Sequence, residues 1–401
     1  MRHVLHLALL AGLVACGDVL PNAPAAHSFS RSDDHVALPP QYVLSKLPTF
    51  GGTSRGTAIN DRGWVAGFSN LAGNAVRRAA LWHDGQLDSL GSLGGPNSSV
   101  VWPGLDNDGM VVGIAETAAT DPFNEDWSCS NFFPSTTHKV CVGFAWQDGV
   151  MTPLPTFGGD NGFATRVNNH GQVVGWAETP IHDPTCNKPQ VLQFRAAMWE
   201  PRKNRMTQLQ PLHGDSTSAA TAINDRGQAV GISGRCDVAV GEFSAQHAVL
   251  WDNGTVTDIG SLGGVAWNTP MAINENGMVV GFSDLPGDDD GTFNARAFRW
   301  TKQTGIDSLG AIGGDPFSEA LGVNNLGQVV GISFGGASGS RGFLWQNGKM
   351  YNLKDLMGAG FADVIVAGQD INDAGVITGR MIDHTTGKTV AFVATPVRST
   401  P

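Results

Sequence analysis

Acidic side chains gather in the least regular segments of this sequence. Two carboxyl groups on either side of a sugar would supply the acid and base of a glycoside hydrolase, and Asp288, Asp289 and Asp290 offer oxygen ligands of the kind that Ca²⁺ prefers. The run from Gly287 to Gly291 departs from the EF-hand spacing, so a solvated acidic loop is the favoured interpretation. The other acids in these segments are Glu116, Asp121, Glu125, Asp126, Glu178, Asp183, Asp237, Glu242, Asp284 and Asp383.

Two histidines lie next to such acids, as His182-Asp183 and Asp383-His384. A carboxylate beside a histidine can tune a general base, although an isolated dipeptide is weak support for one. The sequence contains no Gly-Lys-Ser phosphate loop, Gly-x-Ser-x-Gly elbow or His-Glu-x-x-His zinc motif. The catalytic residues of an enzyme, if this is one, are therefore unknown from the sequence.

Four aromatic residues follow Gly-Gly segments at corresponding places: Trp102, Phe163, Trp267 and Phe317. Aromatic side chains on an exposed rim stack on sugars or anchor peptides, so these four are the candidate ligand-binding residues. The alternative is that they cap a hydrophobic core.

Besides Cys16 the chain has four cysteines, Cys129, Cys141, Cys186 and Cys236, all in predicted long loops. An even number in an exported chain indicates disulfides. We expect pairs 129–141 and 186–236, because the first two share one loop and the others lie in neighbouring repeats. A zinc site is the alternative, but no Cys-x-x-Cys spacing supports it.

These residues are positioned by a repeat. The pattern Asn-x-x-Gly, an apolar pair and Gly recurs six times, and a seventh copy has Asp106 in place of the first Asn. Successive copies start 46 to 62 residues apart, which is the period of propeller blades. The seven segments are Asn60–Gly67, Asp106–Gly113, Asn168–Gly175, Asn224–Gly231, Asn274–Gly281, Asn324–Gly331 and Asn372–Gly379.

Each repeat reads as four short strands. In the first, strand 57–59 enters the Asn turn, strand 64–69 follows, a third strand ends at Trp82, and a fourth, 86–90, runs into Leu-Gly-Gly. The last repeat lacks its fourth strand, which segment 42–47 would supply from the other end of the chain. The predicted fold is therefore all-β, a seven-bladed β-propeller with four antiparallel strands per blade, closed by the N-terminal strand.

The strand before each Asn turn has a small residue two places before the Asn and a branched one beside it, as expected near a crowded axis. Arg166 and Asp370 break the small-residue rule, and we expect them to face each other or solvent. The connections between second and third strands vary most in length. We place any functional site on the face that they share with the Leu-Gly-Gly connections, which we call the long-loop face.

The repeat pattern resembles the bacterial extracellular HAF repeat family. His247-Ala248-Val249-Leu250-Trp251 and Arg296-Ala297-Phe298-Arg299-Trp300 carry the signature best, and the resemblance covers nearly all of 42–397. The second repeat departs from it through Asp106 and a long loop, and the seventh lacks the Trp. The resemblance implies a secreted repeat protein without an assigned role.

The first residues indicate export. Residues 1–15 read as a signal peptide, and Leu13-Val14-Ala15-Cys16 resembles a lipobox, which makes Cys16 the predicted lipidated residue. Segment 16–41 reads as a flexible tether and 42–397 as the propeller. We expect anchoring at the outer membrane or cell surface, with the propeller in the periplasm or outside the cell.

Composition narrows the partners. A formal charge of −11 argues against nucleic acid or an anionic membrane surface, so the lipid is the only expected membrane contact. We expect a monomer that binds a carbohydrate or protein ligand without catalysis, with no cofactor or at most Ca²⁺. The alternative is a carbohydrate-active hydrolase or lyase using loop carboxylates.

Overall fold

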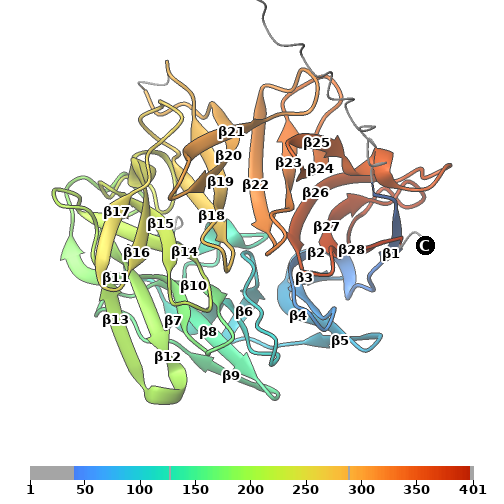
Figure 1. Cartoon of the computed structure of the whole chain (residues 1–401). Coiled ribbons are helices and arrows are strands. Elements are labelled where there is room, and N and C mark those ends of the chain that lie inside the picture. Colours follow the sequence, from blue (N-terminus) through green and yellow to red (C-terminus); the bar gives the residue numbers. More distant parts are fainter. Residues whose placement is uncertain (1–39, 126–127, 288–289, 398–401) are drawn as a thin grey trace, which may run out of the picture. The chain divides into compact units, whose positions relative to one another are not determined.

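The computed structural model describes residues 40–125, 128–287 and 290–397. These residues form one compact unit. Within it, seven four-stranded antiparallel sheets stand in a ring around a central axis (Figure 1). The predicted seven-bladed β-propeller is therefore confirmed.

Blades 1 to 4 follow one another along the chain. Blade 1 contains β2 (Gly51–Ile59), β3 (Val65–Leu71), β4 (Arg77–His83) and β5 (Gln86–Ser89). Blade 2 contains β6 (Gly94–Ser99), β7 (Val111–Thr120), β8 (Lys139–Gln147) and β9 (Val150–Pro153). Blade 3 contains β10 (Gly162–Val167), β11 (Val173–His182), β12 (Leu192–Glu200) and β13 (Arg205–Leu209). Blade 4 contains β14 (Thr217–Ile223), β15 (Ala229–Gly234), β16 (His247–Asp252) and β17 (Thr255–Asp258).

Blades 5 to 7 complete the ring. Blade 5 contains β18 (Thr269–Ile273), β19 (Val279–Asp284), β20 (Ala295–Thr301) and β21 (Gly305–Gly310). Blade 6 contains β22 (Phe317–Val323), β23 (Val329–Phe334), β24 (Arg341–Gln346) and β25 (Lys349–Asn352). Blade 7 contains β26 (Val364–Ile371), β27 (Ile377–Ile382), β28 (Thr389–Pro396) and, at its outer edge, β1 (Tyr42–Lys46). Short 3₁₀ turns are η2 (Ser130–Phe132), η3 (Pro201–Lys203), η4 (Glu242–Ala245) and η5 (Leu353–Leu356).

Closure of the ring uses the first described strand, as predicted. Tyr42 to Lys46 pair antiparallel with Pro396 to Phe392 of β28. The Nζ of Lys46 also lies 2.9 Å from the Asp383 carboxylate and 3.2 Å from that of Asp363, which joins β1 to the loops of blade 7. The two ends of the propeller are thus joined within one sheet, so the ring has no open sheet at the junction.

A bulge shapes the innermost strand of the blades. In blade 1 the pairing register shifts between Gly56 and Ala58, and blades 3 to 7 shift at the equivalent place. The bulge turns a strand carbonyl toward the Gly of the repeat, and a Cβ on Gly67 would collide with the Arg55 carbonyl oxygen. The Gly that ends each repeat motif is therefore required by the bulge in the neighbouring strand.

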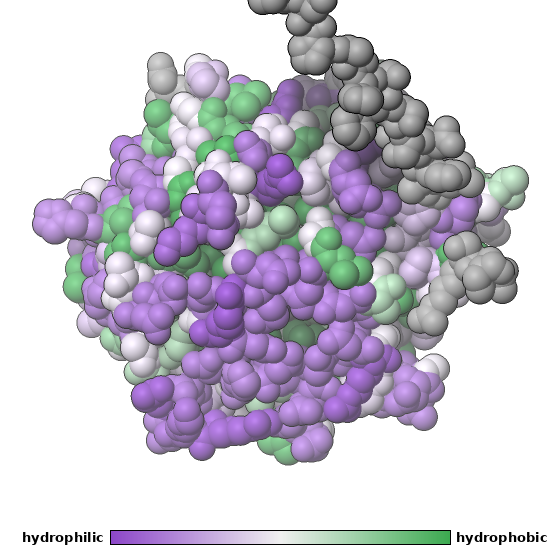
Figure 2. Space-filling view, in the orientation of Figure 1, coloured by the Kyte–Doolittle hydropathy of each residue, from purple (hydrophilic) through white to green (hydrophobic). Residues whose placement is uncertain are grey.

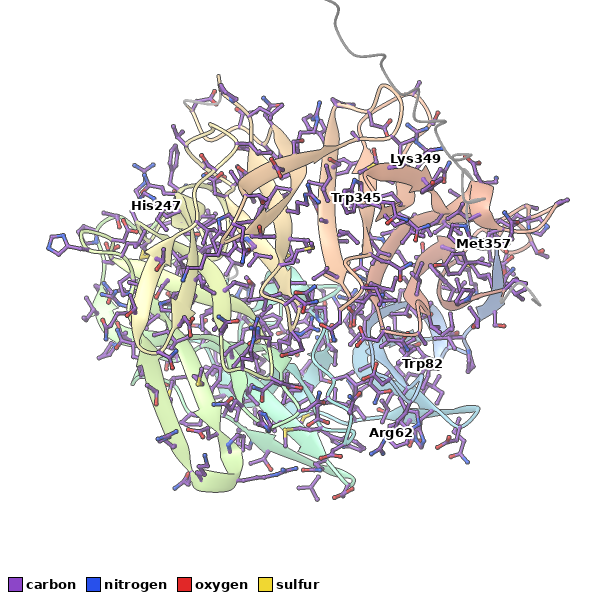
Figure 3. The ribbon with its side chains drawn as sticks, in the orientation of Figure 1. Arg62, Trp82, His247, Trp345, Lys349 and Met357 are labelled. Carbon is purple, nitrogen blue, oxygen red and sulfur yellow. A yellow bond between two sulfur atoms is a disulfide. The ribbon has the colours of Figure 1, made fainter. Side chains whose placement is uncertain are left out.

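The repeated tryptophans pack between blades, as predicted. Trp82 and Trp199 are almost fully buried, and their indole N–H groups donate to the carbonyl oxygens of Pro48 (2.8 Å) and Pro155 (2.9 Å) in the connection from the preceding blade. In Figure 3, Trp82 and Trp345 lie within blades 1 and 6. Trp82 and Trp199 therefore each contribute burial and one hydrogen bond to the connection from the preceding blade.

Two disulfides join loops on the long-loop face, Cys129–Cys141 and Cys186–Cys236, which are the predicted pairs. Cys141 itself belongs to β8 rather than to a loop, because β7 and β8 extend further than the sequence indicates. Glu116 lies on β7, and Glu178 and His182 lie on β11, because β11 also extends further than the sequence indicates. The disulfides indicate an oxidising compartment such as the periplasm or the extracellular space. Among the described residues, no helix is long and apolar enough to cross a membrane.

Candidate functional site

The Asn turns form a hydrogen-bonded ring around one end of the axis, which we call the turn end. In blade 5 the Oδ1 of Asn274 accepts from the N–H groups of Asn276 (3.0 Å) and Met278 (2.9 Å), which holds its own turn. Its Nδ2 donates to the carbonyl oxygen of Asn324 in blade 6 (2.9 Å). Six blades make this bridge; in blade 2, Asp106 has no side-chain N–H with which to reach blade 3.

A second ring follows from the residue after each turn Asn. The carboxylate of Asp225 accepts from the N–H (2.7 Å) and Nδ2 (2.8 Å) of Asn169, and that of Asp373 accepts from the same two groups of Asn325 (2.8 and 2.7 Å). Glu275 accepts from the N–H of Asp225 (2.8 Å). These acids surround the opening at the turn end, but their oxygens already bind neighbouring blades. Hydrophilic residues also dominate the middle of the surface in Figure 2.

The other end of the axis opens, on the long-loop side, into a cavity of ≈ 450 Å³, which we call the axial cavity. Polar and apolar residues line it, and we call the polar set its floor and the apolar set its walls. The polar residues are Arg55, Thr269, Glu319, Ser340, Gln369 and Arg380, and the apolar residues are Val101, Trp102, Val240, Met271, Phe282, Leu321, Ile332 and Phe334.

Blades 5 to 7 differ from blades 1, 3 and 4 in the residue at the bulge. There the bulged residue of blades 1, 3 and 4 is a threonine, and Thr221 donates to Val230 of its own blade (3.2 Å) and Pro270 of the next (2.7 Å). Blades 5, 6 and 7 have Met271, Leu321 and Gln369 at this position, and all three line the cavity.

The charged residues occupy axis-facing positions that are small or apolar in other repeats. Arg55 and Glu319 each lie five residues before their turn Asn, where blade 4 has Ala219. Arg380 lies eight residues after its turn Asn, where blades 5 and 6 have Phe282 and Ile332. The repeat geometry thus brings three charges from blades 1, 6 and 7 into one cavity.

Trp102 reaches the cavity through an insertion. In blade 2 the pairing passes from Ser99 opposite Ile114 to Leu105 opposite Val111, which leaves five residues of the inner strand against two of its neighbour. The equivalent bulge of blade 1, between Arg55 and Ile59, leaves three residues against two. The two additional residues project Trp102 toward the axis.

The charged side chains of the axial cavity have few hydrogen-bonding partners among the described residues. Arg55 donates to the Oε1 of Gln369, but its buried Nε has no partner among the described residues. Burial lowers the pKa of Arg55 well below its usual range, and it also lowers the pKa of Arg380. Repulsion from the Arg380 guanidinium group lowers the pKa of Arg55 further. Burial raises the pKa of Glu319 to about 7, although both arginines oppose the shift.

The opposite half of the long-loop end is filled. Phe163 is fully buried and stacks on Trp176 with ring centroids 4.6 Å apart, and Phe132 of the blade 2 loop contacts both rings. Trp102 packs edge-on against Phe163 at 5.1 Å. Phe163 therefore helps to hold the Trp102 ring in place.

The other predicted aromatics stand around the cavity. Phe317 packs against Phe334, a wall residue, with centroids 5.5 Å apart. Trp267 donates from Nε1 to the carbonyl oxygen of Gly291 (2.8 Å), and its ring contacts Gly241 beside Val240. Trp102 is thus the one predicted ligand-binding residue that lines the cavity among the residues placed in the structure.

Strained backbone surrounds the same opening. Val240, Glu242 and Trp267 have φ values of +56°, +46° and +52°, a left-handed conformation that is unfavourable for side chains of these types. At the turn end the corresponding conformation falls on glycines such as Gly277 (φ +77°). Such strain persists where the surroundings impose it, and it is common around binding sites.

The predicted metal residues give little support for an ion. Asp288 and Asp289 lie outside the described residues, as does Cys16. The carboxylate of Asp290 accepts from the N–H of Thr292 (3.0 Å), and hydrogen bonds from Thr292 lower its pKa. The Ca²⁺ site stays a prediction.

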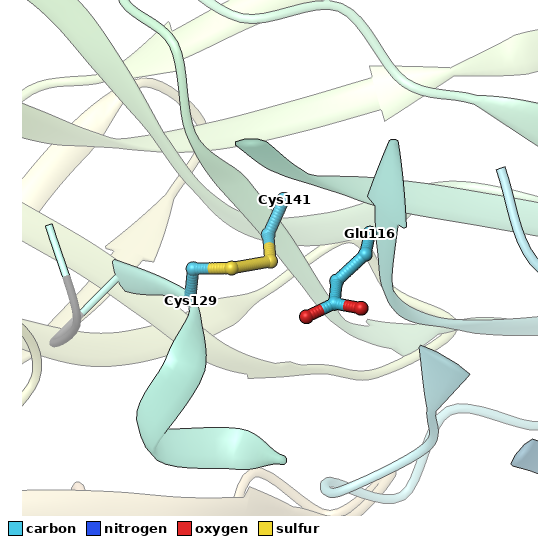
Figure 4. A group of neighbouring side chains, drawn as sticks. All are labelled: Glu116, Cys129 and Cys141. Carbon is cyan, nitrogen blue, oxygen red and sulfur yellow. A yellow bond between two sulfur atoms is a disulfide. The ribbon is translucent and has the colours of Figure 1, made fainter. Parts of the chain in front are cut away.

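Two other clusters have metal-like geometry but are already satisfied. Glu116 lies beside the sulfurs of Cys129 and Cys141 (Figure 4), but those sulfurs form a disulfide and cannot act as thiolates. Asp363, Asp383 and His384 converge, and the Lys46 ammonium lies between the two carboxylates. The His384 Nδ1 lies 2.7 Å from Asp363, so this cluster holds the closing strand.

A buried acidic network ties the loop of blade 2 to blade 3. The Nε2 of Gln190 lies 3.1 Å from the Oε1 of Glu178 and 3.2 Å from that of Glu125. The N–H of Asn161 donates to Glu178 (2.7 Å), and that of Leu192 to Glu125 (2.6 Å). Burial raises the pKa of both Glu178 and Glu125 above the usual carboxyl value. Repulsion from Glu125 adds to the rise for Glu178, and repulsion from Asp121 and Asp160 adds to it for Glu125.

His182 and Asp183 line neither the axial cavity nor the opening at the turn end. The His182 ring contacts Phe123 edge-on at 5.1 Å, and Asp183 accepts from the N–H of Thr185 (2.9 Å). Arg166 and Asp370, which break the small-residue rule, both line the opening at the turn end. Asp370 is buried there and accepts from the N–H of Ile59 (2.9 Å).

No family model matches the chain, and no curated protein matches it in sequence. The fold is similar to virginiamycin B lyase from Staphylococcus aureus, with 11% identity and a TM-score of 0.51 over 89% of this chain and 100% of that one. It is also similar to an acylaminoacyl peptidase from Pyrococcus horikoshii, with 11% identity and a TM-score of 0.50 over 86% of this chain and 52% of that one. At such identity the likeness shows the propeller fold alone. The resemblance to HAF repeats stays a prediction.

Proposed function

We propose that this protein is a binding propeller of the cell envelope, which holds a carbohydrate or protein-derived ligand in the axial cavity without catalysis. The observation that carries the proposal is the cavity itself. At ≈ 450 Å³ it falls within the usual range for ligand sites, and it combines apolar walls with a few convergent polar groups. Trp102 at its edge supplies the flat ring that stacks on a sugar or anchors a side chain.

The cavity favours binding over sugar hydrolysis. A glycoside hydrolase normally needs two carboxyl groups on opposite sides of the scissile bond. Glu319 is the one carboxyl group among the described lining residues, and its neighbours are arginines. The acids around the turn-end opening accept hydrogen bonds from adjacent turns, so they serve the ring.

The proposed location follows from two independent features. The disulfides fit an oxidising compartment, and the sequence before the propeller reads as a signal peptide with Cys16 as the lipidated residue. We propose that the lipid anchors the chain while the propeller faces the periplasm or the exterior. Labelling with radioactive palmitate, lost in Cys16→Ala, would test this.

Binding to glycan and peptide arrays tests the function, with product analysis of every hit. We expect Trp102→Ala to weaken binding at least about tenfold, the usual effect of losing an aromatic anchor. The matched control is Trp64→Ala, because Trp64 lies beside Arg62 in the blade 1 turn, away from the cavity. Met271→Trp, which fills the cavity without removing a packed ring, should weaken binding as well.

Two results would contradict the proposal. Binding that neither Trp102→Ala nor Met271→Trp affects would exclude the axial cavity as the site. Product formation that is abolished by Glu319→Gln would identify an enzyme. Repeating the arrays with EDTA tests whether Ca²⁺ contributes.

A further inference from the structure

We infer that the axial cavity recognises an organic anion, namely a carboxylate attached to an apolar or aromatic body. This rests on the proposed function, since it names the chemistry of the ligand at the same site. The inference comes from the state of the two arginines, from the charge balance of the cavity and from its apolar walls.

The arginines have hydrogen-bonding capacity that the described residues leave unused. Arg55 makes one hydrogen bond, to Gln369, and its buried Nε has none. The Arg380 side chain is partly buried and makes no hydrogen bond or ion pair with a described residue. A guanidinium group has five N–H donors in a planar fork that fits a carboxylate, and leaving it unpaired away from water is costly.

Glu319 does not neutralise the pair. No hydrogen bond or ion pair joins it to Arg55 or Arg380 among the described residues, and it is one carboxyl group against two cations. No other titratable residue lines the cavity in the described part of the chain; Arg77, on β4, adds a further positive charge near Arg55. The cavity is therefore positive inside a protein with a formal charge of −11, and it will attract anions.

The walls select the kind of anion. Met271, Phe282 and Phe334 favour an apolar or aromatic body over a bare inorganic ion. Glu319 disfavours a dianion such as a phosphate monoester, because it repels additional charge when ionised. When protonated it can donate a hydrogen bond to a carboxylate. A ligand with a single carboxylate on an apolar body can pair with the arginines and pack against the apolar side chains.

Matched pairs of compounds test this chemistry. N-acetyl phenylalanine, N-acetyl leucine and N-acetyl tryptophan would each be titrated beside their carboxamides by calorimetry, together with phenyl phosphate and a peptide ending in phenylalanine. We expect each acid to bind about 10- to 100-fold more tightly than its amide, the usual effect of charge-assisted hydrogen bonds. Binding of the peptide as well would indicate a chain terminus as the source of the carboxylate, whereas exclusive binding of the small acids would indicate a free metabolite.

Substitutions in the cavity assign the effect to residues. Arg380→Met should remove most of the preference for acid over amide, and Arg55→Met should reduce it. Arg62→Met is the matched control, because Arg62 (labelled in Figure 3) lies in a blade 1 turn and its guanidinium group pairs with Asp108. Thermal unfolding of each variant verifies that the propeller is intact.

The pH dependence supplies a second readout. Lowering the pH from 8.5 to 6 protonates Glu319, whose pKa burial raises to about 7, and leaves a ligand carboxylate ionised. The cavity then becomes more positive, so acids should bind more tightly as the pH falls. Glu319→Gln should remove this pH dependence.

The outcomes separate the two proposals. If acids and amides bind equally, and Trp102→Ala weakens both while Arg380→Met weakens neither, the cavity is the site but the anion chemistry is wrong. If the phosphate binds more tightly than the acids, the carboxylate assignment is overturned. If no cavity substitution affects the binding of any ligand found on the arrays, the proposed function fails together with the inference.

Discussion

The two ends of the central axis are built from the same inner strands, but they leave their polar groups in opposite states. At the turn end, Asn274 and its equivalents bind their own turn and the next blade, and the acids around them accept backbone N–H groups. At the long-loop end, the axial cavity is lined by Arg55, Arg380 and Glu319, which have few hydrogen-bonding partners among the described residues. One end thus holds the ring together, and the other contains the cavity that we propose as the ligand site.

Backbone strain follows the same division. Positive φ values at the Asn turns fall on glycine, which adopts them without penalty, whereas Val240 and Trp267 adopt them beside the cavity. Natural proteins retain such local conflicts mainly where function requires them. The difference is consistent with a turn end that serves stability and a long-loop end that serves the proposed recognition of a ligand.

Breaking one link of the turn ring should have the largest effect. Asn274→Ala removes three hydrogen bonds of a buried side chain, so we expect the free energy of unfolding to fall by about 2–3 kcal/mol. Ligand affinity at the other end should stay unchanged. Urea denaturation measures the first quantity. Asn276→Ala is the control, because it removes from the same turn a single exposed hydrogen bond, to the carbonyl oxygen of Asn325 in blade 6 (2.9 Å). A large loss of affinity in Asn274→Ala would mean that the two ends are coupled.

The buried acids of the long-loop face should make stability depend on pH. Because the pKa of Glu178 is raised to about 8, the folded state holds this proton more tightly than the unfolded chain does. Its contribution is fully present below the ordinary carboxyl value and is lost as the pH rises through about 8. Glu178→Gln should therefore flatten the fall in unfolding free energy between pH 5 and pH 9. An unchanged slope would show that other groups cause it.

Releasing the strain at the cavity should separate stability from recognition. Val240→Gly suits a φ of +56°, so we expect unfolding to cost about 1 kcal/mol more. The same change removes part of an apolar wall, so ligand binding should weaken. Thermal melts and titrations on one preparation compare the two effects. A variant that loses stability would show that the packing of the Val240 side chain outweighs its backbone strain.

Completing the turn ring should have the smallest effect. Asp106→Asn keeps the oxygen that accepts from Asp108 and Met110 and adds an N–H group aimed at blade 3. We expect a gain of about 0.5–1 kcal/mol in the free energy of unfolding, the net value of one hydrogen bond. A loss of stability would indicate that the blade 2 turn is held too far from Asn168 to form the link.

The sequence predicted the propeller, its closure and both disulfides. The first two depend on a motif that recurs along the chain, and the disulfides depend on a small, even number of cysteines. The Asn turns, the terminal Trp of the third strand and the displaced strand 42–47 all report local geometry. The sequence also pointed to Trp102. It did not reveal that β7 and β11 extend far enough to carry Glu116 and Glu178, because their pairing depends on partners distant in the chain.

The charged floor of the cavity was missed, although a signal for it was present. Arg55, Glu319 and Arg380 each break a row that is small or apolar in other blades, as Arg166 and Asp370 do. The deviations become informative only after the bulge is known, because it changes which residues face the axis. Comparing every repeat position across blades, rather than the motif alone, would have identified them.

The most direct test of the central claim is a crystal structure of the protein with the tightest-binding N-acetyl amino acid. The account predicts the ligand in the axial cavity, with its carboxylate within hydrogen-bonding distance of Arg380 or Arg55 and its side chain against Met271 and Phe334. A ligand bound at the turn end, or one whose carboxylate points away from both arginines, would contradict it.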